Sequence, residues 1–399
     1  MSDLSDRVDE IDPDAFEREL RDGADVVVID TRDRDAFAEW HVDAGDAQLL
    51  NLPESELVAD PDTMLVGIPA DARLRVICNA GNASRRVAAA LDGHAREALS
   101  VRDGLIGWSR VLQHDEVLLP GSVTLVQFRR EARGCLSYLV LAGGEALVVD
   151  PSANVQPYID EAMARGARIV RVLDTHVHAD HLSGARELAR RTGAALHLSD
   201  GALARGVTYA VEVTAVTDGD ALALGSEAVR VVALPGHTSD MTGILIGDEV
   251  LIGGDSLFVD GVARPDLESG DEGAATAARQ LHRTLRERVA GLPDTTRLAP
   301  CHYPGGRRAG ALAPPLGEVR AAVAELALDE DAFVERVLSA MPPRPANYLS
   351  IIGRNLGDDV SEEDAARLEI GANNCAANSG RAAGASRAIV GLAPEVSND

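Results

Sequence analysis

The segment Thr175–His181, with the sequence THVHADH, constrains this chain more than any other feature. It places three imidazoles and a carboxylate side by side, although the whole chain holds only 10 histidines. A packed helix or strand has no use for such a cluster, whereas zinc, iron and manganese prefer neutral imidazole and carboxylate ligands. We therefore interpret the segment as the core of a metal site.

The surroundings of this cluster indicate an α/β fold. Apolar residues 169–173 predict a buried strand and residues 185–191 a helix, so the cluster occupies a loop at the carboxyl end of a strand, where α/β folds build their sites. Three later apolar runs each end near one candidate ligand, namely His237, Asp255 and His302. Because several strand ends that deliver ligands are more specific than one histidine, we expect these residues to meet at one metal centre.

This order of motifs resembles the metallo-β-lactamase fold. The H-x-H-x-D-H motif, the Gly236-His237-Thr238 turn, the Gly254-Asp255 turn and the late His302 follow one another as in that family, and residues 146–151 match its Asp-Pro strand end. The resemblance covers residues 121–310. It implies an αββα sandwich, with two sheets back to back, helices outside and metals at one edge.

The fold alone does not fix the chemistry, and the resemblance leaves two alternatives. A glyoxalase II-like hydrolase would hold two zinc ions per chain and attack an ester or thioester with a metal-bound hydroxide. Asp255 would bridge the two zincs, whose other ligands would be His176, His178 and His237 on one side and Asp180, His181 and His302 on the other.

In the second alternative the chain is an oxygenase. One Fe(II) per chain would bind a 2-His-1-carboxylate triad and keep open positions for substrate and O2. The triad would be His176, His237 and Asp255, and the groups that orient ligands and water around it would be His178, Asp180, His181 and His302.

The flanking residues favour the oxygenase. Arg264-Pro265-Asp266 is similar to the Arg-x-Asp that follows the metal aspartate in persulfide dioxygenases, and residues 127–139 also look like the first strands of that family. Two segments depart from its pattern, GVAR at 261–264 in place of Gly-Cys-Gly-Arg and CHYP at 301–304 in place of Ala-His-Asp-Tyr. The resemblance implies that Arg264 anchors the substrate or lies just behind it; a structural ion pair with Asp266 is the alternative.

Residues 10–118 carry a second, independent signal. A predicted strand over residues 74–77 runs into Cys78, which precedes a loop rich in Asn and Gly, Arg85 and a helix. This pattern resembles a rhodanese domain with Cys78 in the nucleophile position. Backbone N–H groups at such a loop and helix start stabilise a thiolate or an anionic persulfide, and Arg85 and Arg86 add positive charge. The alternative is a buried structural cysteine.

Together the two resemblances imply an N-terminal rhodanese α/β domain followed by a metallo-β-lactamase αββα sandwich. Such a protein would oxidise low-molecular-weight thiol persulfides with O2 to sulfite, while Cys78 carries sulfane sulfur. The main alternative is a binuclear zinc thioester hydrolase with an accessory rhodanese domain. A sulfurtransferase whose second domain is inactive and a non-catalytic, sulfide-responsive binding protein are further alternatives.

The amino-acid composition limits which binding partners and which cellular compartment can be expected. The net charge is −26 and all 38 basic residues are arginine, so the surface repels nucleic acid and anionic membranes. Such an excess of carboxylates is what a halophilic protein carries; an acidic proteome of a GC-rich genome is the alternative. No run approaches the roughly 20 apolar residues of a membrane helix, and the acidic N-terminus does not resemble a signal peptide. With four cysteines, a cytoplasmic protein is expected.

The predicted boundaries are 10–118 for the rhodanese-like domain, 121–340 for the sandwich and 341–399 for a C-terminal tail. Helical patterns at 316–328 and 331–340 would cover the sandwich or a dimer contact, since relatives of the dioxygenase are often dimers. Residues 351–355 either fold back near the site or form a linker, and small residues after Gly371 predict a loosely ordered end. Cys135 and Cys375 are expected to be inert.

Overall fold

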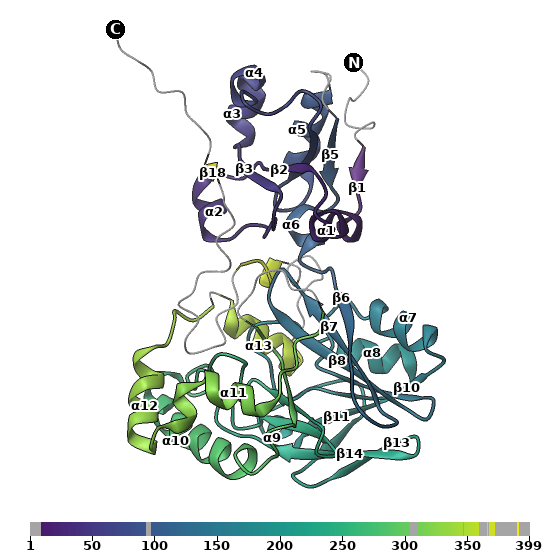
Figure 1. Cartoon of the computed structure of the whole chain (residues 1–399), viewed down its shortest axis with the longest axis vertical. Coiled ribbons are helices and arrows are strands. Elements are labelled where there is room, and N and C mark those ends of the chain that lie inside the picture. Colours follow the sequence, from purple (N-terminus) through teal and green to yellow (C-terminus); the bar gives the residue numbers. More distant parts are fainter. Residues whose placement is uncertain are drawn as a thin grey trace.

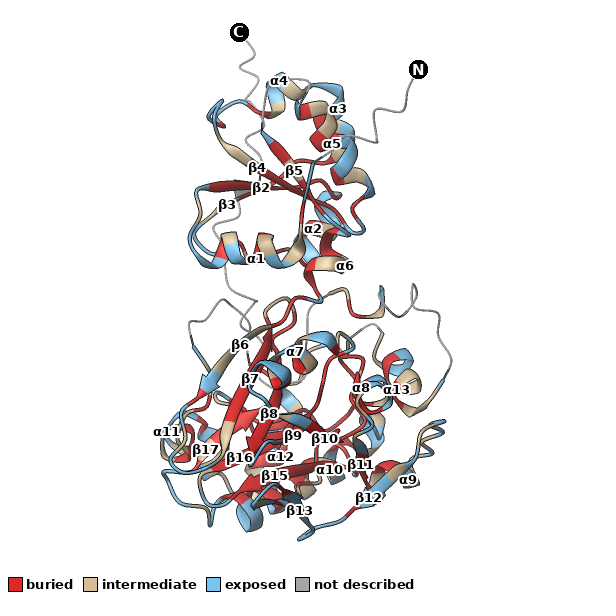
Figure 2. Cartoon of the chain, turned by 90° about the vertical axis from the view of Figure 1, so that its right-hand side faces the viewer, coloured by how far each residue is buried: buried red, intermediate tan, exposed pale blue. Residues whose placement is uncertain are grey.

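The computed structural model describes residues 9–92, 97–303, 310–345, 347–358, 365, 367–371 and 389–390. A smaller N-terminal part stands at one end of a larger part (Figures 1 and 2). In both parts the buried residues concentrate on the sheets (Figure 2). Within the described ranges, every helix is too short or too polar to cross a bilayer.

The N-terminal part is built on one parallel sheet. Its strands, in spatial order, are β1 (Glu10–Ile11), β5 (Ala98–Val101), β4 (Arg73–Ile77), β2 (Val26–Asp30), β3 (Gln48–Asn51) and β18 (Ile389–Val390). Strand β18 comes from near the C-terminus of the chain and extends the sheet beyond β3. Alternate residues of β2 pack into two different apolar clusters, Val28 with Phe16 and Ile29 with Leu74, so both faces of the sheet are buried.

Helices cover both faces of this sheet. They are α1 (Pro13–Arg21), α2 (Arg34–Glu39), α3 (Glu54–Ala59), α4 (Pro61–Met64), α5 (Asn82–Asp92) and α6 (Gly104–Trp108). The start of α1 shows why the sequence forms a helix there, because Asp12 accepts a hydrogen bond from the amide of Asp14 and Pro13 takes the first helical position.

The larger part contains two sheets. The first has the order β12 (Val213–Val216), β11 (Ala195–Ser199), β10 (Arg168–Leu173), β9 (Glu145–Val149), β8 (Cys135–Ala142), β7 (Thr124–Arg130), β6 (Gln113–Val117). The second has the order β13 (Ala221–Leu224), β14 (Glu227–Ala233), β15 (Thr242–Ile246), β16 (Val250–Gly254), β17 (Arg297–Pro300). One apolar cluster joins Val140 and Leu173 of the first sheet to Val231 and Ile252 of the second. The two sheets therefore face each other across a shared core, as expected.

Helices lie outside both sheets. The helices α7 (Gln156–Ala164) and α8 (Ala185–Thr192) bury Tyr158 and Leu188 against the first sheet. On the second sheet Leu281 and Phe333 pack from a helical layer that consists of α10 (Gly270–Thr284), the π-helical turn η2 (Leu285–Val289), α11 (Leu316–Ala322), the 3-10 turn η3 (Ala324–Ala327) and α12 (Glu330–Ser339). The helix expected over 316–328 is thus divided at Val323, whose backbone is extended.

The segment 341–399, predicted to be a tail, contains a folded helix. Helix α13 (Tyr348–Leu356) packs Ile352 beside Val177, and a short helix α9 (Asp200–Ala204) joins the same cluster. Of the two alternatives for residues 351–355, folding back near the site is the one observed. The stretch after Gly371, including Cys375, lies outside the described residues except for β18.

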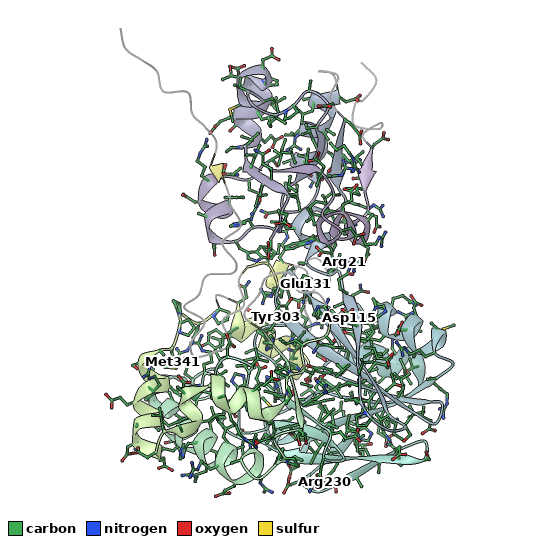
Figure 3. The ribbon with its side chains drawn as sticks, in the orientation of Figure 1. Arg21, Asp115, Glu131, Arg230, Tyr303 and Met341 are labelled. Atoms are coloured by element: carbon green, nitrogen blue, oxygen red, sulfur yellow. The ribbon has the colours of Figure 1, made fainter. Side chains whose placement is uncertain are left out.

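A side-chain hydrogen bond joins the two parts, because Arg21 at the end of α1 donates to Gln113 at the start of β6. Figure 3 labels Arg21, Asp115, Glu131 and Tyr303 close to this junction. Buried Arg129 binds Asp115 at 2.5 Å and Glu131 at 3.1 Å, and the hydroxyl of Tyr303 donates to Glu131. Tyr303, the residue after the candidate ligand His302, is therefore bound to the hairpin β7–β8 at the edge of the sandwich that faces the N-terminal part.

Candidate metal centre

Five strand ends deliver polar side chains to one edge of the sandwich. Strands β9 and β10 of the first sheet end at Asp150 and Asp174, and β14, β16 and β17 of the second sheet end shortly before His237, Asp255 and His302. The turn before His237 requires glycine, because Gly236 has a φ of 146° and a Cβ there would lie 2.4 Å from the Cα of Leu281. Each of these side chains thus lies at the sheet edge within a few residues of the end of a buried strand.

His176, His237 and Asp255 form one buried group whose ligand atoms all lie within 4.8 Å of one another. Oδ2 of Asp255 is 3.9 Å from Nε2 of His176 and 3.6 Å from Nε2 of His237. No hydrogen bond from any described residue reaches these three atoms. Buried polar atoms without partners are costly, and a metal ion bound to all three would remove that cost. The three residues therefore fit a metal ion.

The other ring nitrogen of each histidine fixes this orientation. Nδ1 of His237 donates to the carbonyl of Arg264 at 2.7 Å. The hydroxyl of Thr175 donates to Asp150 at 2.9 Å, so it accepts from Nδ1 of His176 at 2.9 Å. Both rings are thereby assigned a proton on Nδ1 and a lone pair on Nε2, the form that binds metals. Burial, and then the neighbouring imidazoles, keep the pKa of His176 well below 6.5.

A second buried group adjoins the first and consists of Cys135, Asp180, His181 and His302. Asp255 links the two groups, because its Oδ1 accepts from Nδ1 of His302 at 2.6 Å while its Oδ2 faces the first group. Nε2 of His302 lies 2.5 Å from Oδ2 of Asp180. Burial disfavours a charge on His302, but Asp180 and Asp255 outweigh it and raise the pKa of His302 well above 6.5. Nδ1 of His302 thus has a hydrogen bond to Asp255. Its Nε2 lies close to Asp180 but, like both ring nitrogens of His181, has no hydrogen bond from the described residues.

Cys135, which was expected to be inert, lies at the second group. Its Sγ lies 3.9 Å from Oδ2 of Asp180, and its backbone pairs with that of His302. Cys135 is the first residue of β8, and the approach of β8 to the end of β17 is a long-range contact. No local pattern in the sequence signals it.

His178 is turned toward a third group that contains Asp150 and Asp174. Its Nε2 donates to Asp150 at 2.9 Å, and Asp150 also accepts from the thiol of Cys301 at 2.7 Å. Burial favours neutral Asp150, but the positive charge of His178 outweighs it and lowers the pKa of Asp150. Burial likewise opposes a charge on His178, yet Asp150 raises the pKa of His178 to about 9. The sequence indicated the strand end at Asp150-Pro151, but it did not indicate that Asp150 binds both His178 and Cys301.

Two residues of the C-terminal segment bind the loop between β10 and α8, which contains His176, His178, Asp180 and His181 and is called the metal loop. Nδ2 of Asn355 donates to the carbonyls of His178 at 3.0 Å and His181 at 2.8 Å. The carboxylate of Glu369 accepts from the amide of Leu182 at 2.9 Å. Both side chains are buried. The sequence offered residues 351–355 as a segment that folds back near the site, but it indicated no role for Asn355 or Glu369, since nothing near them in the sequence resembles a site motif.

Arg264 forms the ion pair that was the alternative to a substrate contact. Its guanidinium binds both oxygens of Asp266, at 2.7 and 3.0 Å, and is 1% exposed as a residue. Arg344 binds the same carboxylate at 2.7 Å. The pair holds the loop whose Arg264 carbonyl orients His237, so the structure gives Arg264 a positioning contact in the metal centre.

In the N-terminal part, Cys78 follows β4 directly and is buried. Its Sγ accepts from the amide of Ser84, in the first turn of α5, at 3.4 Å. The amide of Leu105 in α6 donates to the carbonyl of Cys78 at 2.8 Å. A Cβ on Gly104 would lie 2.1 Å from that carbonyl oxygen, so only glycine allows α6 to approach. Two helix starts therefore converge on Cys78.

The two arginines expected near Cys78 differ in their contacts. Nε of Arg85 is 3.6 Å from Glu10, whereas Arg86 binds Glu54 at 2.6 and 3.0 Å. The hydrogen bond to Glu54, and to a smaller extent the charge of Cys78, raise the pKa of Arg86. Arg86, rather than Arg85, is thus the arginine whose charge interacts with Cys78.

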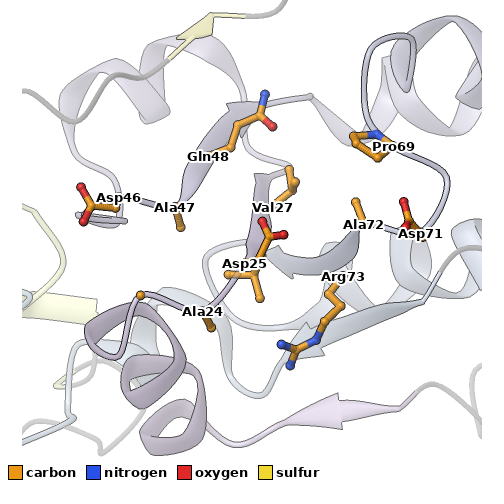
Figure 4. A pocket seen from close by; sticks show the side chains of 12 residues that line it. Ala24, Asp25, Val27, Asp46, Ala47, Gln48, Pro69, Asp71, Ala72 and Arg73 are labelled. Carbon is orange, nitrogen blue, oxygen red and sulfur yellow. The ribbon is translucent and has the colours of Figure 1, made fainter.

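A pocket of about 560 Å³ lies elsewhere in the N-terminal part (Figure 4). It is lined by residues at the starts of the strands, such as Asp25 before β2, Gln48 of β3 and Arg73 of β4. Cys78 lies beyond the other end of β4 and does not line it. This pocket therefore belongs to the edge of the sheet opposite the cysteine.

Comparisons with known proteins concern the larger part. The model of the metallo-beta-lactamase superfamily matches residues 130–302. A probable metallo-hydrolase of Burkholderia pseudomallei is 33% identical over 46% of this chain and 74% of its own length. A hydroxyacylglutathione hydrolase of Acidiphilium cryptum is 36% identical over 42% of this chain and 64% of its own length. The human mitochondrial persulfide dioxygenase ETHE1 is 27% identical, over 40% of this chain and 59% of its own length.

Solved structures agree with these relatives. A metallo-beta-lactamase from Staphylococcus aureus superposes with a TM-score of 0.55 at 25% identity, over 61% of this chain and 75% of that one. ETHE1 from Myxococcus xanthus superposes with a TM-score of 0.50 at 26% identity, over 58% of this chain and 96% of that one. The matched family region begins at residue 130 and leaves the N-terminal sheet outside it.

Proposed function

Because the chain belongs to the metallo-beta-lactamase superfamily, we propose that it oxidises a low-molecular-weight thiol persulfide with O2 to sulfite. One Fe(II) per chain would be held by His176, His237 and Asp255. The observation that carries this proposal is the convergence of the triad. The ligand atoms of its three residues lie within 4.8 Å of one another and have no hydrogen bond from described residues, and two imidazoles with one carboxylate are the ligand set of a single Fe(II) site.

Bound iron would supply a place where the terminal sulfur of the persulfide and O2 meet. The protein residues orient the metal ligands and hold a proton near them. Asp255 holds His302 through one oxygen and faces the triad with the other, and Thr175 and the Arg264 carbonyl keep both triad histidines in their ligand form. His302, held between Asp180 and Asp255, is placed to hold a proton at Nδ1 next to the triad. Overall, one persulfide, one O2 and one water would give thiol, sulfite and protons.

The persulfide substrate is supported by the relatives and by the flanking residues. One of the relatives is named a persulfide dioxygenase, and Arg264-Pro265-Asp266 follows Asp255 as the resemblance to that family requires. The ion pair that Arg264 makes with Asp266 stabilises the loop that orients His237. Arg264 would then affect substrate binding indirectly, because its loop positions the metal ligand His237.

We propose further that the N-terminal part is a rhodanese-like domain in which Cys78 carries sulfane sulfur. The parallel sheet, the position of Cys78 at the end of β4 and the amide of Ser84 on its sulfur support this role. Cys78 would attack the terminal sulfur of a persulfide, so that a new persulfide forms on Cys78 and the thiol leaves. Backbone N–H groups stabilise the anionic sulfur.

A binuclear zinc thioester hydrolase is the second candidate function. It is favoured by relatives named hydroxyacylglutathione hydrolase and by the second group, in which Asp180, His181 and His302 lie together. A second metal ion there would have to displace the contacts that His302 makes with two carboxylates.

The test is O2 uptake by anaerobically purified, iron-loaded protein on addition of glutathione persulfide, with sulfite assayed afterwards. Uptake with a matching amount of sulfite is the expected result. Absence of uptake, together with two zinc ions per chain and thioester hydrolysis without O2, would establish the hydrolase instead.

A further inference from the structure

A pocket of about 720 Å³ lies beside the metal loop, and the function proposed above makes no use of it. Its wall includes residues 182–184, which follow His181 directly, and Arg110, which follows α6 in the N-terminal part. The charged residues on the wall are Arg110, Arg186, Arg190, Arg354, Glu187 and Glu369. The whole chain has 64 acidic and only 38 basic residues. The pocket wall, in contrast, has more arginines than carboxylates.

Both carboxylates on this wall are already bound by arginines. Glu187 pairs with Arg190 on α8, at 2.7 and 2.8 Å. Glu369 pairs with Arg130 at 2.5 Å, and Arg130 is not part of the wall. The charge of Arg130 outweighs burial and lowers the pKa of Glu369, so this carboxylate stays ionised and paired.

The other three arginines of the wall are not held by a carboxylate among the described residues. Within the described part of the chain, Arg110, Arg186 and Arg354 form no ion pair, although the charge of Arg186 acts on Asp174. Arg186 instead lies over the ring of Tyr209, 4.7 Å from its centre, and donates to the carbonyl of Arg354 at 2.9 Å. Arg354 in turn donates to the carbonyl of Asp358 at 2.9 Å.

These contacts hold the guanidinium groups in place without neutralising them. An aromatic ring and backbone carbonyls restrict the side chains of Arg186 and Arg354, so less entropy is lost when a ligand binds them. The planar guanidinium fork matches the oxygens of carboxylates and phosphates. The wall therefore presents preorganised positive charge to the pocket.

We propose that this pocket binds a small organic anion that carries two or more carboxylate or phosphate groups. Its volume falls within the range of about 300–1,000 Å³ that is typical of small-molecule sites and exceeds what one inorganic ion would fill. The ligand would lie between the two candidate centres. Residues 182–184 continue from the metal loop, and α6, which precedes Arg110, donates backbone hydrogen bonds to Cys78 and Asn79. This proposal does not depend on the proposed oxidation chemistry.

Isothermal titration of the full-length, metal-loaded protein tests the site, with citrate as the polycarboxylate probe and pyrophosphate as the phosphate probe. We expect saturable binding of at least one probe, one molecule per chain, and the stronger probe assigns the class of ligand. Arg354→Gln should weaken it about tenfold, as expected for loss of one charge-assisted hydrogen bond. Arg110→Gln should weaken it as well, and because Arg110 is exposed, its replacement should not disturb the fold.

Arg168→Gln is the matched control, because Arg168 is exposed at the start of β10, outside the pocket wall, and pairs with Glu145. Its binding should equal that of the unmodified protein. Thermal unfolding of each variant shows whether the fold is kept. Failure of both probes to bind, or equal binding by the unmodified protein and both pocket variants, would overturn the proposal.

Discussion

The side-chain amide of Asn355 donates a 2.8 Å hydrogen bond to the backbone carbonyl of His181. A residue of the C-terminal segment thus holds the loop that carries the metal ligands, and a second bond to the His178 carbonyl fixes the same loop at another point. The segment 341–399 therefore takes part in the architecture of the site.

Replacement of Asn355 should loosen the metal loop. In Asn355→Ala two buried carbonyls lose their donor, which costs about 1–3 kcal/mol for each group left unsatisfied. We expect a lower melting temperature and a metal affinity reduced about tenfold, a size known for residues behind the ligands. Asn347→Ala is the control, because the side chain of Asn347 donates to the Leu368 carbonyl and, among the described residues, has no bond to the metal loop. Equal loss of metal in both variants would contradict a specific role of Asn355.

Removal of a triad residue should empty the metal centre. Asp255→Ala and His237→Ala each remove one of the three converging ligand atoms, so bound iron should fall to the background of the assay while the fold is retained. Metal analysis measures the bound iron, and circular dichroism measures whether the fold is retained. His114→Ala, a half-exposed histidine outside the site, should keep its iron. Full iron and full activity in Asp255→Ala would show that the ligands lie elsewhere.

The two candidate centres should be separable by mutation. Cys78→Ser should reduce sulfur transfer to background, because serine cannot form a persulfide, and should leave O2 uptake with an external persulfide unchanged. Transfer is measured as thiocyanate formed from thiosulfate and cyanide. If both activities disappeared, the centres would not act independently.

The arginine that acts on Cys78 should be Arg86. Arg86→Gln removes the guanidinium that interacts electrostatically with the cysteine, so the rate of sulfur transfer should fall several-fold. Arg85→Gln is the matched control, since Arg85 is turned to Glu10, and should change the rate little. The reverse ranking would assign the role to Arg85, as the sequence suggested.

Stability should depend on the protonation of His197 in β11. Burial, and then the charge of Arg171, lower the pKa of His197 from 6.5 to about 4 in the folded chain. Between these values the unfolded chain binds the proton and the folded chain does not, so stability is lost as the pH falls from 6.5 toward 4. Urea unfolding should show a smaller loss over this interval for His197→Gln. Parallel pH curves for the two proteins would exclude this histidine as the cause.

Salt should stabilise the protein if its charge reflects adaptation to high salt. A net charge of −26 creates repulsion within the compact state, which ions screen. We expect unfolding and loss of activity at low salt and recovery of both in molar KCl. A melting temperature that does not change with KCl would favour the acidic composition of a GC-rich genome.

Local patterns in the sequence were sufficient for the strands and for the main ligands. The apolar run before Thr175 predicts a strand that the structure has as β10, and the runs before His237, Asp255 and His302 correspond to β14, β16 and β17. A buried strand has a strong local signature, and a polar residue directly after it lies at a sheet edge. For this reason the sequence could predict that these histidines and Asp255 meet.

Only the tertiary structure decided which residues surround those ligands. Cys135 joins the site because β8 lies next to the end of β17, Asp150 because β9 pairs with β10, and Asn355 because α13 folds back on the loop. The choice between Arg85 and Arg86 beside Cys78 also depends on where Glu10 and Glu54 lie. Such contacts join residues far apart in the chain, and they arise from how sheets and helices pack, which a local pattern of residues does not encode.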